Sequence, residues 1–434
     1  MKNLITTALL ASSAIVSAQS IEDFINPATG IIDDHRLVLE SMEEQYPGYK
    51  QVVNETFDKC HQFSTKSGQE YTVNVVFHVV YNEEEENLPD SVIYSQLDVL
   101  NEDFGRMNAD SVNLRPIFQP IAGNPAVHFN LAGIVRVPTT ASFTVGFNGL
   151  PDEVKQSSQG GSDAWDTQYF MNVWICKLDN PFGALFGYAY PPAGLSNWPA
   201  NSNAPSPELD GVVLDYRTVG RNNPNPYPNP QGGGNFVFTG RTGTHEVGHY
   251  MGLRHIWGDG GGLFGGESCG EDDGIADTPN QGYQSDFNCD PTLNTCTDST
   301  GGAPDPNDMP DLIENHMDYS DETCKNMFTL GQAMHIRGVL ENERIDLINA
   351  PASIEESTKS VLNLYPNPNN GTFLINSNVS GILSVFDLQG RMVHSQKINN
   401  GLSNGEIANV SSGTYIVKLN SENGESITDK LIIK

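Results

Sequence analysis

One short segment restricts the fold of this chain more than any other: residues 245–259 read HEVGHYMGLRHIWGD. His245 and His249 are four residues apart, so on a helix their side chains lie on one face and can bind the same cation. Gly252 then breaks the helix, because glycine accepts a positive φ and permits a sharp turn, and the turn lets His255 return to that cation. Three neutral imidazoles suit Zn²⁺, which in catalytic sites keeps a fourth position for water. Glu246 lies near the same rim and can accept a proton from that water, whose pKa the metal lowers.

Two simpler interpretations of this segment fit it less well. An ordinary helix with hydrogen-bonded histidines does not call for a third histidine at a fixed distance beyond a glycine, and histidine is rare here, at 10 of 434 residues. A purely structural zinc site is usually closed by four protein ligands rich in cysteine. No cysteine lies within residues 245–259. The segment therefore favours a catalytic zinc site.

The charge balance and the N-terminus indicate an exported protein. The chain has 54 Asp and Glu against 23 Lys and Arg, a formal net charge of −31. It lacks the basic footprint of a nucleic-acid binder, and an anionic membrane surface is an unfavourable partner. Residues 1–18 are predicted to be a signal peptide, because a lysine is followed by the apolar run 4–16 and then by a cleavage site with two small residues one position apart. A buried helix is the alternative. No other stretch approaches the ~18 apolar residues of a membrane span, and in an exported chain the six cysteines can oxidise.

Hydrophobic periodicity divides the chain into an α/β part and an all-β part. Alternation over residues 71–81 predicts a central strand, in which we interpret His78 as a packed residue rather than a ligand. Further strands are expected at 127–135, 173–178 and 211–216, and helical patterns at 33–44, 90–108, 240–253 and 330–347. After a linker at 350–360, short strands separated by turn signals suit a small all-β sandwich at 361–434; they are expected at 372–375, 383–386, 415–419 and 430–433.

The zinc segment and several others together resemble a known protease group. HExxHxxGxxH followed by a Met-turn is the metzincin signature, and the ending at Asp259 looks like that of the pappalysin family, which includes ulilysin. Segments 240–244 (GRTGT), 269–281 (CGEDDGIADTPNQ) and 315–319 (NHMDY) resemble the family's lead-in to the helix, its calcium loop and its Met-turn. The resemblance covers residues 71–349. It implies an α/β metzincin catalytic domain at 70–349, with a twisted mixed sheet, an active-site helix and a loop-rich C-terminal half, after a pro-segment at 19–69.

The resemblance also implies roles for individual residues. The three histidines would hold zinc, and Glu246 would act as general base to the zinc-bound water and then pass the proton to the leaving amine. Met317 would form the hydrophobic floor beneath the metal, a role close to plain core packing. Tyr319 would lie near the metal and stabilise the tetrahedral oxyanion, with simple packing around the site as the alternative.

The family's calcium loop corresponds here to residues 272–278. Hard oxygen ligands in a glycine-containing turn suit Ca²⁺, and the family match singles out Asp273 and Thr278 as ligands. A solvated acidic turn is the alternative. The resemblance thus implies two cofactors, one catalytic Zn²⁺ and one structural Ca²⁺.

The cysteines after the zinc motif fit the family's two disulfides. The resemblance implies that Cys269 pairs with Cys296 and Cys289 with Cys324, although sequence alone permits three pairings of these four. Cys176, in an apolar strand, is interpreted as a buried thiol. Three interpretations of Cys60 stay open: a latency ligand that covers the zinc, a partner for Cys176, or a free thiol. The family's latency motif is usually Cys-Gly-Thr, and here His and Gln follow instead.

Glu322 gives an expectation about specificity. It matches the acidic residue that, in ulilysin-like enzymes, lies at the base of the pocket for the residue just after the scissile bond. A carboxylate in a partly desolvated pocket favours a cation, best of all an Arg that binds it bidentately. We therefore expect cleavage on the N-terminal side of Arg, and less well of Lys. The alternative is that Glu322 is a solvated loop residue.

The C-terminal segment has a resemblance of its own. It contains four motifs in this order: LYPNPNNGTF, VFDLQGRMV, VSSGTYIVKL and KLIIK. Together they look like a type A sorting domain of the type IX secretion system. A generic β-sandwich binding module is the alternative. The implied product is a secreted or outer-membrane-attached zinc endopeptidase, with protein or peptide substrates and the type IX machinery as partners. Two rivals stay open. One is a cell-surface adhesin with an inactive metalloprotease fold, against which the intact Glu246 and histidines argue, and the other is a metallohydrolase with a non-protein substrate.

Overall fold

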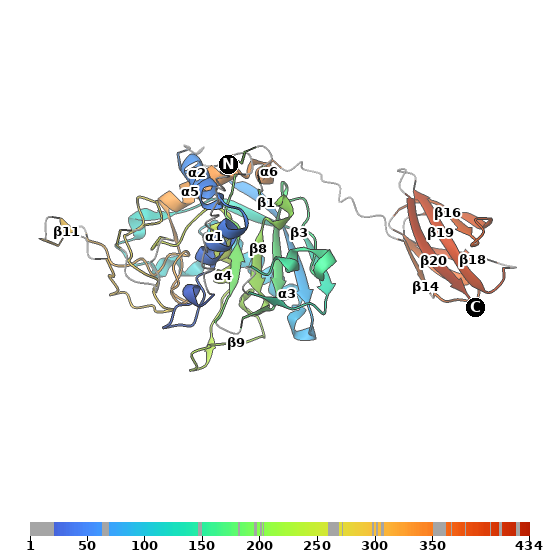
Figure 1. Cartoon of the computed structure of the whole chain (residues 1–434), viewed down its shortest axis with the longest axis horizontal. Coiled ribbons are helices and arrows are strands. Elements are labelled where there is room, and N and C mark those ends of the chain that lie inside the picture. The colour runs from blue at the N-terminus through green and yellow to red at the C-terminus, as the bar shows by residue number, and fades with distance from the viewer. Residues whose placement is uncertain are drawn as a thin grey trace, which may run out of the picture. The chain divides into compact units, whose positions relative to one another are not determined.

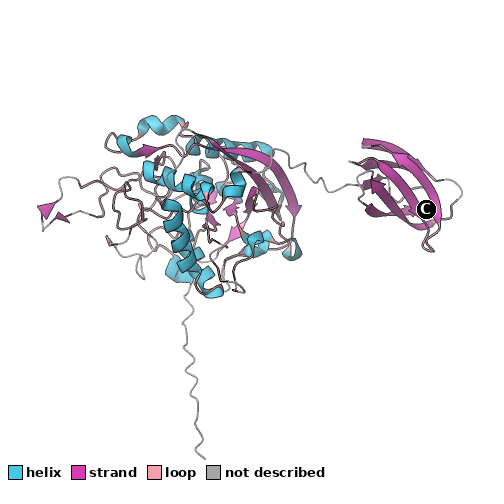
Figure 2. Cartoon of the chain, turned by 90° about the horizontal axis from the view of Figure 1, so that it is seen from above, coloured by secondary structure: helices cyan, strands magenta, loops and turns pink. Residues whose placement is uncertain are grey.

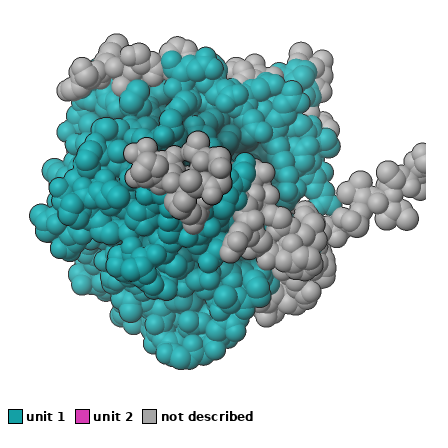
Figure 3. All heavy atoms as spheres, turned by 90° about the vertical axis from the view of Figure 1, so that its left-hand side faces the viewer, with its two compact units in different colours: residues 1–349 teal, residues 350–434 magenta. Residues whose placement is uncertain are grey.

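The chain forms two compact units, residues 1–349 and residues 350–434 (Figure 1). The computed structural model describes residues 21–62, 69–145, 150–180, 183–194, 198–199, 202, 204–258, 269–270, 272–296, 299–300, 303–304, 308–349, 362–365, 367–377, 379–399, 401–407, 410–421 and 426–434. Figure 3 shows one face of the first unit, coloured teal. No helix within these ranges is both long and apolar enough to cross a membrane.

A five-stranded mixed sheet forms the centre of the first unit, in the order β3-β1-β5-β8-β7. Four strands are parallel, and β7 (Gly187–Ala189) is an antiparallel edge strand. The four are β1 (Tyr71–Tyr81), β3 (Val127–Pro138), β5 (Phe170–Cys176) and β8 (Val212–Asp215). Every residue of β5 and β8 is buried, as expected for parallel strands covered on both faces. The four parallel strands correspond to the four expected strands, whereas three-residue β7 was not predicted.

His78 is a packed residue of the central strand β1. Its ring is fully buried and stacks on Trp174, with 5.1 Å between ring centroids. Nδ1 lies 2.8 Å from the Ser162 hydroxyl and Nε2 lies 3.0 Å from Asn172 Oδ1. Burial lowers the pKa of His78 to about 4, so the ring is neutral at physiological pH.

Helices cover the sheet and carry the site. α3 (Asp90–Phe104) packs on β3 and on α4 (Arg241–Tyr250), and α4 also lies against β7 and β8. The helix expected at 330–347 is two helices, α5 (Leu330–Glu341) and α6 (Ile345–Ile348), because the chain turns at residues 342–344. α5 begins with a capping box in which Thr329 and Gln332 each bind the other's backbone N–H.

Two helices precede the sheet in sequence and pack on the same unit. α1 (Asp34–Gln45) contacts β7, and α2 (Tyr49–His61) contacts α5. In Figure 1, α1 is the dark blue helix, and α2 is the lighter blue helix beside the orange α5. α1 corresponds to the helical pattern at 33–44, whereas α2 was not predicted.

The segment between α4 and α5 has little regular structure. Its described residues contain only the two-residue strands β11 (Ser299–Thr300), β12 (Ala303–Pro304) and β13 (Phe328–Thr329). Short strands elsewhere in the first unit are β2 (Ala122–Gly123), β4 (Phe143–Thr144), β6 (Leu178–Asp179), β9 (Tyr227–Pro228) and β10 (Asn235–Phe236). Cys269 is bonded to Cys296 and Cys289 to Cys324, the pairing that the family resemblance implies. These two bridges tie the loops to one another.

The second unit consists of two antiparallel sheets (Figure 2). One has the order β14-β15-β18 and the other β17-β16-β19-β20. Their inner faces share a core in which Ile375, Leu383, Val417, Leu419 and Leu431 are fully buried. The strands are β14 (Leu362–Tyr365), β15 (Thr372–Ser377), β16 (Gly381–Phe386), β17 (Met392–Ile398), β18 (Gly401–Glu406), β19 (Gly413–Ser421) and β20 (Ser426–Ile433). The four expected strands fall within β15, β16, β19 and β20.

Candidate metal centre and active site

Helix α4 and the turn after it bring the three predicted histidines together. All ten residues of α4 are buried. The helix ends at Tyr250, and Gly252, with φ of +84°, reverses the chain. As a result, His245 Nε2 lies 3.1 Å from His249 Nε2 and 3.3 Å from His255 Nε2, and the last two atoms are 3.2 Å apart.

The arrangement of the rings fits a metal ion. His245 Nδ1 donates to the carbonyl of His316 at 2.8 Å, and His249 Nδ1 donates to the carbonyl of Leu253 at 2.9 Å. These bonds leave the Nε2 lone pairs facing inward, the usual arrangement of metal-binding histidines. Burial lowers the pKa of both rings, to about 4 for His249, so both are neutral. A tetrahedral ion with Zn–N bonds of about 2.0–2.1 Å keeps its ligand atoms about 3.3 Å apart, close to the spacing here.

Glu246 faces the same space from the next position of α4. Its side chain is buried, and within the described part of the chain its Oε2 has no hydrogen-bond partner. A Cβ on Gly187 would lie 2.8 Å from Glu246 Cγ, so the edge strand β7 passes beside Glu246 without room for a side chain. Burial, and then the charge of Asp34, raises the pKa of Glu246 well above its ordinary value.

Met317 and Tyr319 bound the histidine cluster on two sides. Met317 is fully buried under α4, and a Cβ on Gly248 would lie only 2.3 Å from its Sδ. The Tyr319 ring lies 4.9 Å from the ring of His255 and 5.4 Å from that of His245, between centroids. The sulfur is therefore a floor beneath the ligand helix, and the phenol is a wall of the site.

The structure adds a residue that the sequence did not single out. Asp34, the first residue of α1, joins the three histidines in a group whose ligand atoms all lie within 4.8 Å of one another. Its Oδ1 is 3.3 Å from His255 Nε2, and its Oδ2 is 3.8 Å from His245 Nε2. No spacing rule links residue 34 to residue 245, because the contact depends on how α1 packs on the folded unit.

Cys60 is not part of the histidine cluster. It is a buried free thiol in the last turn of α2, where its backbone carbonyl packs on Gly338 of α5. Burial raises the pKa of its thiol to about 11, which opposes formation of a thiolate. Cys176 is also a free buried thiol, so the two are not paired. Of the three interpretations of Cys60, the structure supports the free thiol.

The predicted calcium residues are in direct contact. Asp273 Oδ1 accepts hydrogen bonds from the Thr278 hydroxyl at 2.7 Å and from the Ile275 N–H at 2.9 Å. Asp273 is buried, its Oδ2 has no partner among the described residues, and burial raises its pKa to about 7. Asp277 instead accepts hydrogen bonds from Thr329 and Gly331 at the start of α5.

Asp259 and the signal peptide at 1–18 lie outside the described residues.

A small pocket adjoins the metal centre and contains Glu322. Glu322 is buried there, and its two oxygens accept hydrogen bonds from the backbone of Thr239, Arg241 and Thr242 and from both threonine hydroxyls. It therefore anchors the N-terminus of α4, where a negative charge is favourable. Buried Lys325 lines the same pocket. The rest of its wall is formed by Ile31, Ile32, Asp34, Phe186, Phe238, Thr242, His245, Glu246, Phe287 and Tyr319.

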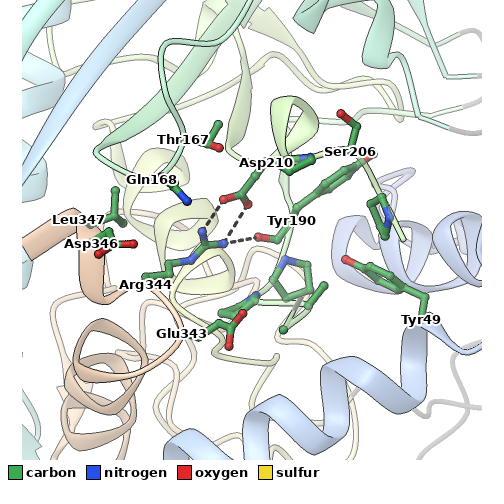
Figure 4. Close-up of a pocket in the computed structure, with 16 residues that line it drawn as sticks. Tyr49, Thr167, Gln168, Tyr190, Ser206, Asp210, Glu343, Arg344, Asp346 and Leu347 are labelled. Carbon is green, nitrogen blue, oxygen red and sulfur yellow. Dashed lines mark hydrogen bonds and ion pairs between the residues drawn. The ribbon is translucent and has the colours of Figure 1, made fainter. Parts of the chain in front are cut away.

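A larger cavity, about 260 Å³ in volume, lies apart from the metal centre, between Tyr49 of α2 and residues 343–347 (Figure 4). Arg344 projects into it and pairs with both oxygens of Asp210, while its guanidinium also donates to the carbonyl of Tyr190. None of the three histidines lines this cavity. We interpret it as part of the contact between α2 and the rest of the unit.

The fold and the site together define a metzincin-type zinc metalloendopeptidase. Residues 237–341 match the model of the pregnancy-associated plasma protein-A family, and residues 363–434 match a secretion system C-terminal sorting domain. An extracellular metalloprotease of Verticillium alfalfae is 31% identical over 272 residues, which are 61% of this chain and 74% of that protein. Extracellular metalloprotease 1 of Coccidioides posadasii is 30% identical over 267 residues, 60% of this chain and 73% of that protein.

Solved structures of related metalloproteases are also similar to this chain. A mutant of Tannerella forsythia promirolysin is 33% identical, with a TM-score of 0.59, and the match covers 74% of this chain and 97% of that one. Mature mirolysin in complex with a cleaved peptide is 36% identical, with a TM-score of 0.53, over 65% of this chain and 96% of that one. The chain belongs to the pregnancy-associated plasma protein-A (pappalysin) family of metalloproteases. It is a secreted enzyme that carries a type IX sorting domain.

Proposed function

We propose that this chain hydrolyses internal peptide bonds of proteins with Glu246 as the general base. The observation that carries the proposal is the Glu246 Oε2, which has no hydrogen-bond partner among the described residues, beside three inward-facing imidazoles. A zinc ion held by the histidines would lower the pKa of a water and polarise the substrate carbonyl. Glu246 would take the proton at Oε2 and then donate it to the leaving nitrogen. Its burial keeps bulk water from competing for that proton.

Other residues would support this reaction without taking the proton. Tyr319 would donate a hydrogen bond from its phenol to the developing oxyanion, an interaction that is strong in a desolvated site. Met317 would hold the ligand helix from below. A calcium ion on Asp273 and Thr278 would stabilise the loops, a role supported by the Asp273 Oδ2, which has no hydrogen-bond partner in the described part of the chain.

The proposal extends to processing. Residues 1–18 would be removed as a signal peptide, residues 19–69 would act as a pro-segment before the catalytic domain at 70–349, and residues 361–434 would direct export after the linker at 350–360. The start of the pro-segment runs into the metal centre through Asp34, which supports synthesis as a zymogen.

Substrate specificity would depend on the pocket beside Glu246, which is lined by both Glu322 and Lys325. Glu322 predicts cleavage on the N-terminal side of Arg, and less well of Lys. Its oxygens, however, already accept five hydrogen bonds, and a carboxylate has only about four lone-pair sites. A basic substrate would have to compete with these donors and approach Lys325.

A gelatin zymogram tests the proposed function against its main rival. The matured enzyme should clear the gel, lose this activity in a zinc chelator and regain it when zinc is restored. A cell-surface adhesin with an inactive protease fold would bind proteins but leave the gel intact under all three conditions. A hydrolase of non-protein substrates would give that result too and would differ from the adhesin only in a non-peptide hydrolysis assay.

A further inference from the structure

Asp34 stands where a fourth metal ligand would stand. Its carboxylate oxygens lie 3.3 Å from His255 Nε2, 3.6 Å from His249 Nε2 and 3.8 Å from His245 Nε2. The side chain is nine-tenths buried or more and reaches all three rings at once. Carboxylate oxygens are common zinc ligands, and a site with four protein ligands has no open position for water or substrate.

The surrounding chain holds Asp34 in this place. Ile32 N–H donates to the Ala184 carbonyl at 2.9 Å, and Ala184 N–H donates to the Gly30 carbonyl at 2.8 Å, so the segment before Asp34 pairs with the chain just ahead of β7. The Asp34 N–H donates to the Tyr319 hydroxyl at 3.2 Å. On the other side, the His35 ring stacks on His249, with 4.3 Å between centroids.

We propose that Asp34 is the fourth zinc ligand of the full-length chain and keeps it inactive until the peptide bond after the pro-segment is hydrolysed. The same segment forms one wall of the pocket beside Glu246 with two isoleucines and engages the Tyr319 phenol. Metal, substrate pocket and oxyanion donor are thus blocked together. Release needs only peptide hydrolysis, with water as co-reactant, and no oxidation of Cys60. This inference rests on the proposed zinc site.

The test uses full-length chain in a Glu246→Ala background, so that it cannot process itself, loaded with Co²⁺ in place of Zn²⁺. Asp34→Asn keeps the shape of the side chain but removes its charge. The matched control is Glu40→Gln on the same helix, whose carboxylate pairs with Lys50. Two readouts are measured: the visible absorption spectrum of the bound Co²⁺, and the affinity for acetohydroxamate, a small ligand that needs an open metal position.

The expected result is a changed Co²⁺ spectrum and at least tenfold tighter acetohydroxamate binding in Asp34→Asn, with Glu40→Gln like its parent. Equal spectra and equal affinities in Asp34→Asn and the parent would overturn the proposal while leaving the zinc site intact. Failure of the parent to bind Co²⁺ at all would instead overturn the proposed function. If Asp34→Asn unfolds, the parent alone still decides, because an open site would bind acetohydroxamate before the pro-segment is removed.

A second inference comes from Lys325. This residue is 4% exposed, lines the pocket beside Glu246, and forms no hydrogen bond or ion pair with any described residue. Its charged neighbours are the carboxylates of Glu322, Asp318 and Asp34 and the cation of Arg241. Glu322 is already occupied at the start of α4, Asp318 accepts a hydrogen bond from Gln281 at 2.9 Å through Oδ1 while its Oδ2 makes none with a described residue, and Asp34 would leave with the pro-segment. The mature pocket would then contain a buried ammonium group that makes no hydrogen bond although two carboxylates remain near it, and a ligand that supplies an acceptor would stabilise it.

We infer that Lys325 selects an acidic side chain next to the scissile bond, in place of the basic side chain that Glu322 alone would favour. The phenylalanine walls of the pocket remove water from the contact, and a charge-assisted hydrogen bond in such a site discriminates strongly against a neutral or positive side chain. The inference rests on the proposed endopeptidase activity and concerns only the choice of peptide bond.

Mass spectrometry of a cleaved peptide library tests this with mature enzyme, Lys325→Met, and Lys177→Met as a control at a half-exposed lysine. The wild type and the control should cut next to Glu or Asp, and Lys325→Met should lose at least tenfold in that preference. Cleavage next to Arg by the wild type, or an unchanged profile in Lys325→Met, would overturn the inference. Cleavage by none of the three would count against the proposed endopeptidase instead. Should Lys325→Met fail to fold, the wild-type profile alone still decides.

Discussion

The contact between Gly248 and Met317 offers a quantitative test of how the metal centre is supported. Gly248 lies between His245 and His249 on α4, and a methyl group there would lie 2.3 Å from Met317 Sδ and 3.1 Å from its Cε. Carbon and sulfur atoms in contact are usually ~3.5–4.0 Å apart. Either the fully buried Met317 or the helix would therefore have to move by more than an ångström.

Overpacking of this kind typically costs about 1–3 kcal/mol. We expect Gly248→Ala to lower stability by an amount in that range, which corresponds to roughly 1–2 °C in Tm per kcal/mol for a unit that spans residues 1–349. Because the displaced helix carries His245 and His249, zinc affinity should fall as well. Met317→Ala alone should destabilise through the cavity that it leaves, and the two substitutions together should cost less than their sum.

Differential scanning calorimetry and zinc titration of the wild type, the two single variants and the double variant measure these effects. Gly270→Ala is the control, since a methyl group there would meet no atom of the described residues within 4 Å. The reasoning is refuted if Gly248→Ala melts and binds zinc like the wild type, or if the Gly248 and Met317 effects are strictly additive.

Three further predictions concern the rest of the chain. Strong calcium chelation at constant zinc occupancy should lower Tm, because an ion bound only to the native loop at Asp273 and Thr278 stabilises it by mass action; an unchanged Tm would count against that site. Deletion of residues 361–434 should leave peptide hydrolysis intact and abolish export from the native host, so normal secretion of the truncated enzyme would contradict the sorting role. The contribution of His78 to stability should fall as the pH drops from 6.5 toward 4, because the unfolded chain protonates His78 in this window and the folded chain, with a pKa of about 4, does not. That loss is roughly 3 kcal/mol, so the difference in urea-denaturation stability between the wild type and His78→Phe should shift by about this amount, in favour of the variant, over this range.

The sequence predicts those parts of the fold that depend on local patterns. Alternation marks β1, and a glycine at a fixed distance marks the turn that returns His255 to the site. The spacing of the zinc motif needs only one helix and one turn, so little tertiary information is required. The edge strand β7 escapes prediction because three residues are too few for a period to emerge.

Contacts between segments that are far apart in the sequence could not be predicted from local patterns. Asp34 is an ordinary acidic residue at a helix start until α1 packs on the folded unit and brings it to the histidines. Cys60 attracted attention as a metal-binding residue type, but α2 places it against α5. Glu322 was expected to be free for substrate, yet the start of α4 supplies donors to both of its oxygens. In each case the decisive partner lies far along the chain.

The central claim is that Glu246 carries the reacting proton while the histidines hold the metal. Measurement of zinc content and peptide hydrolysis on the same sample of mature Glu246→Ala tests it most directly. We expect close to one zinc per chain, as in the wild type, with hydrolysis reduced by at least a thousandfold, in line with removal of a residue essential to the chemical step. Retained hydrolysis, or loss of zinc together with activity, would contradict the account.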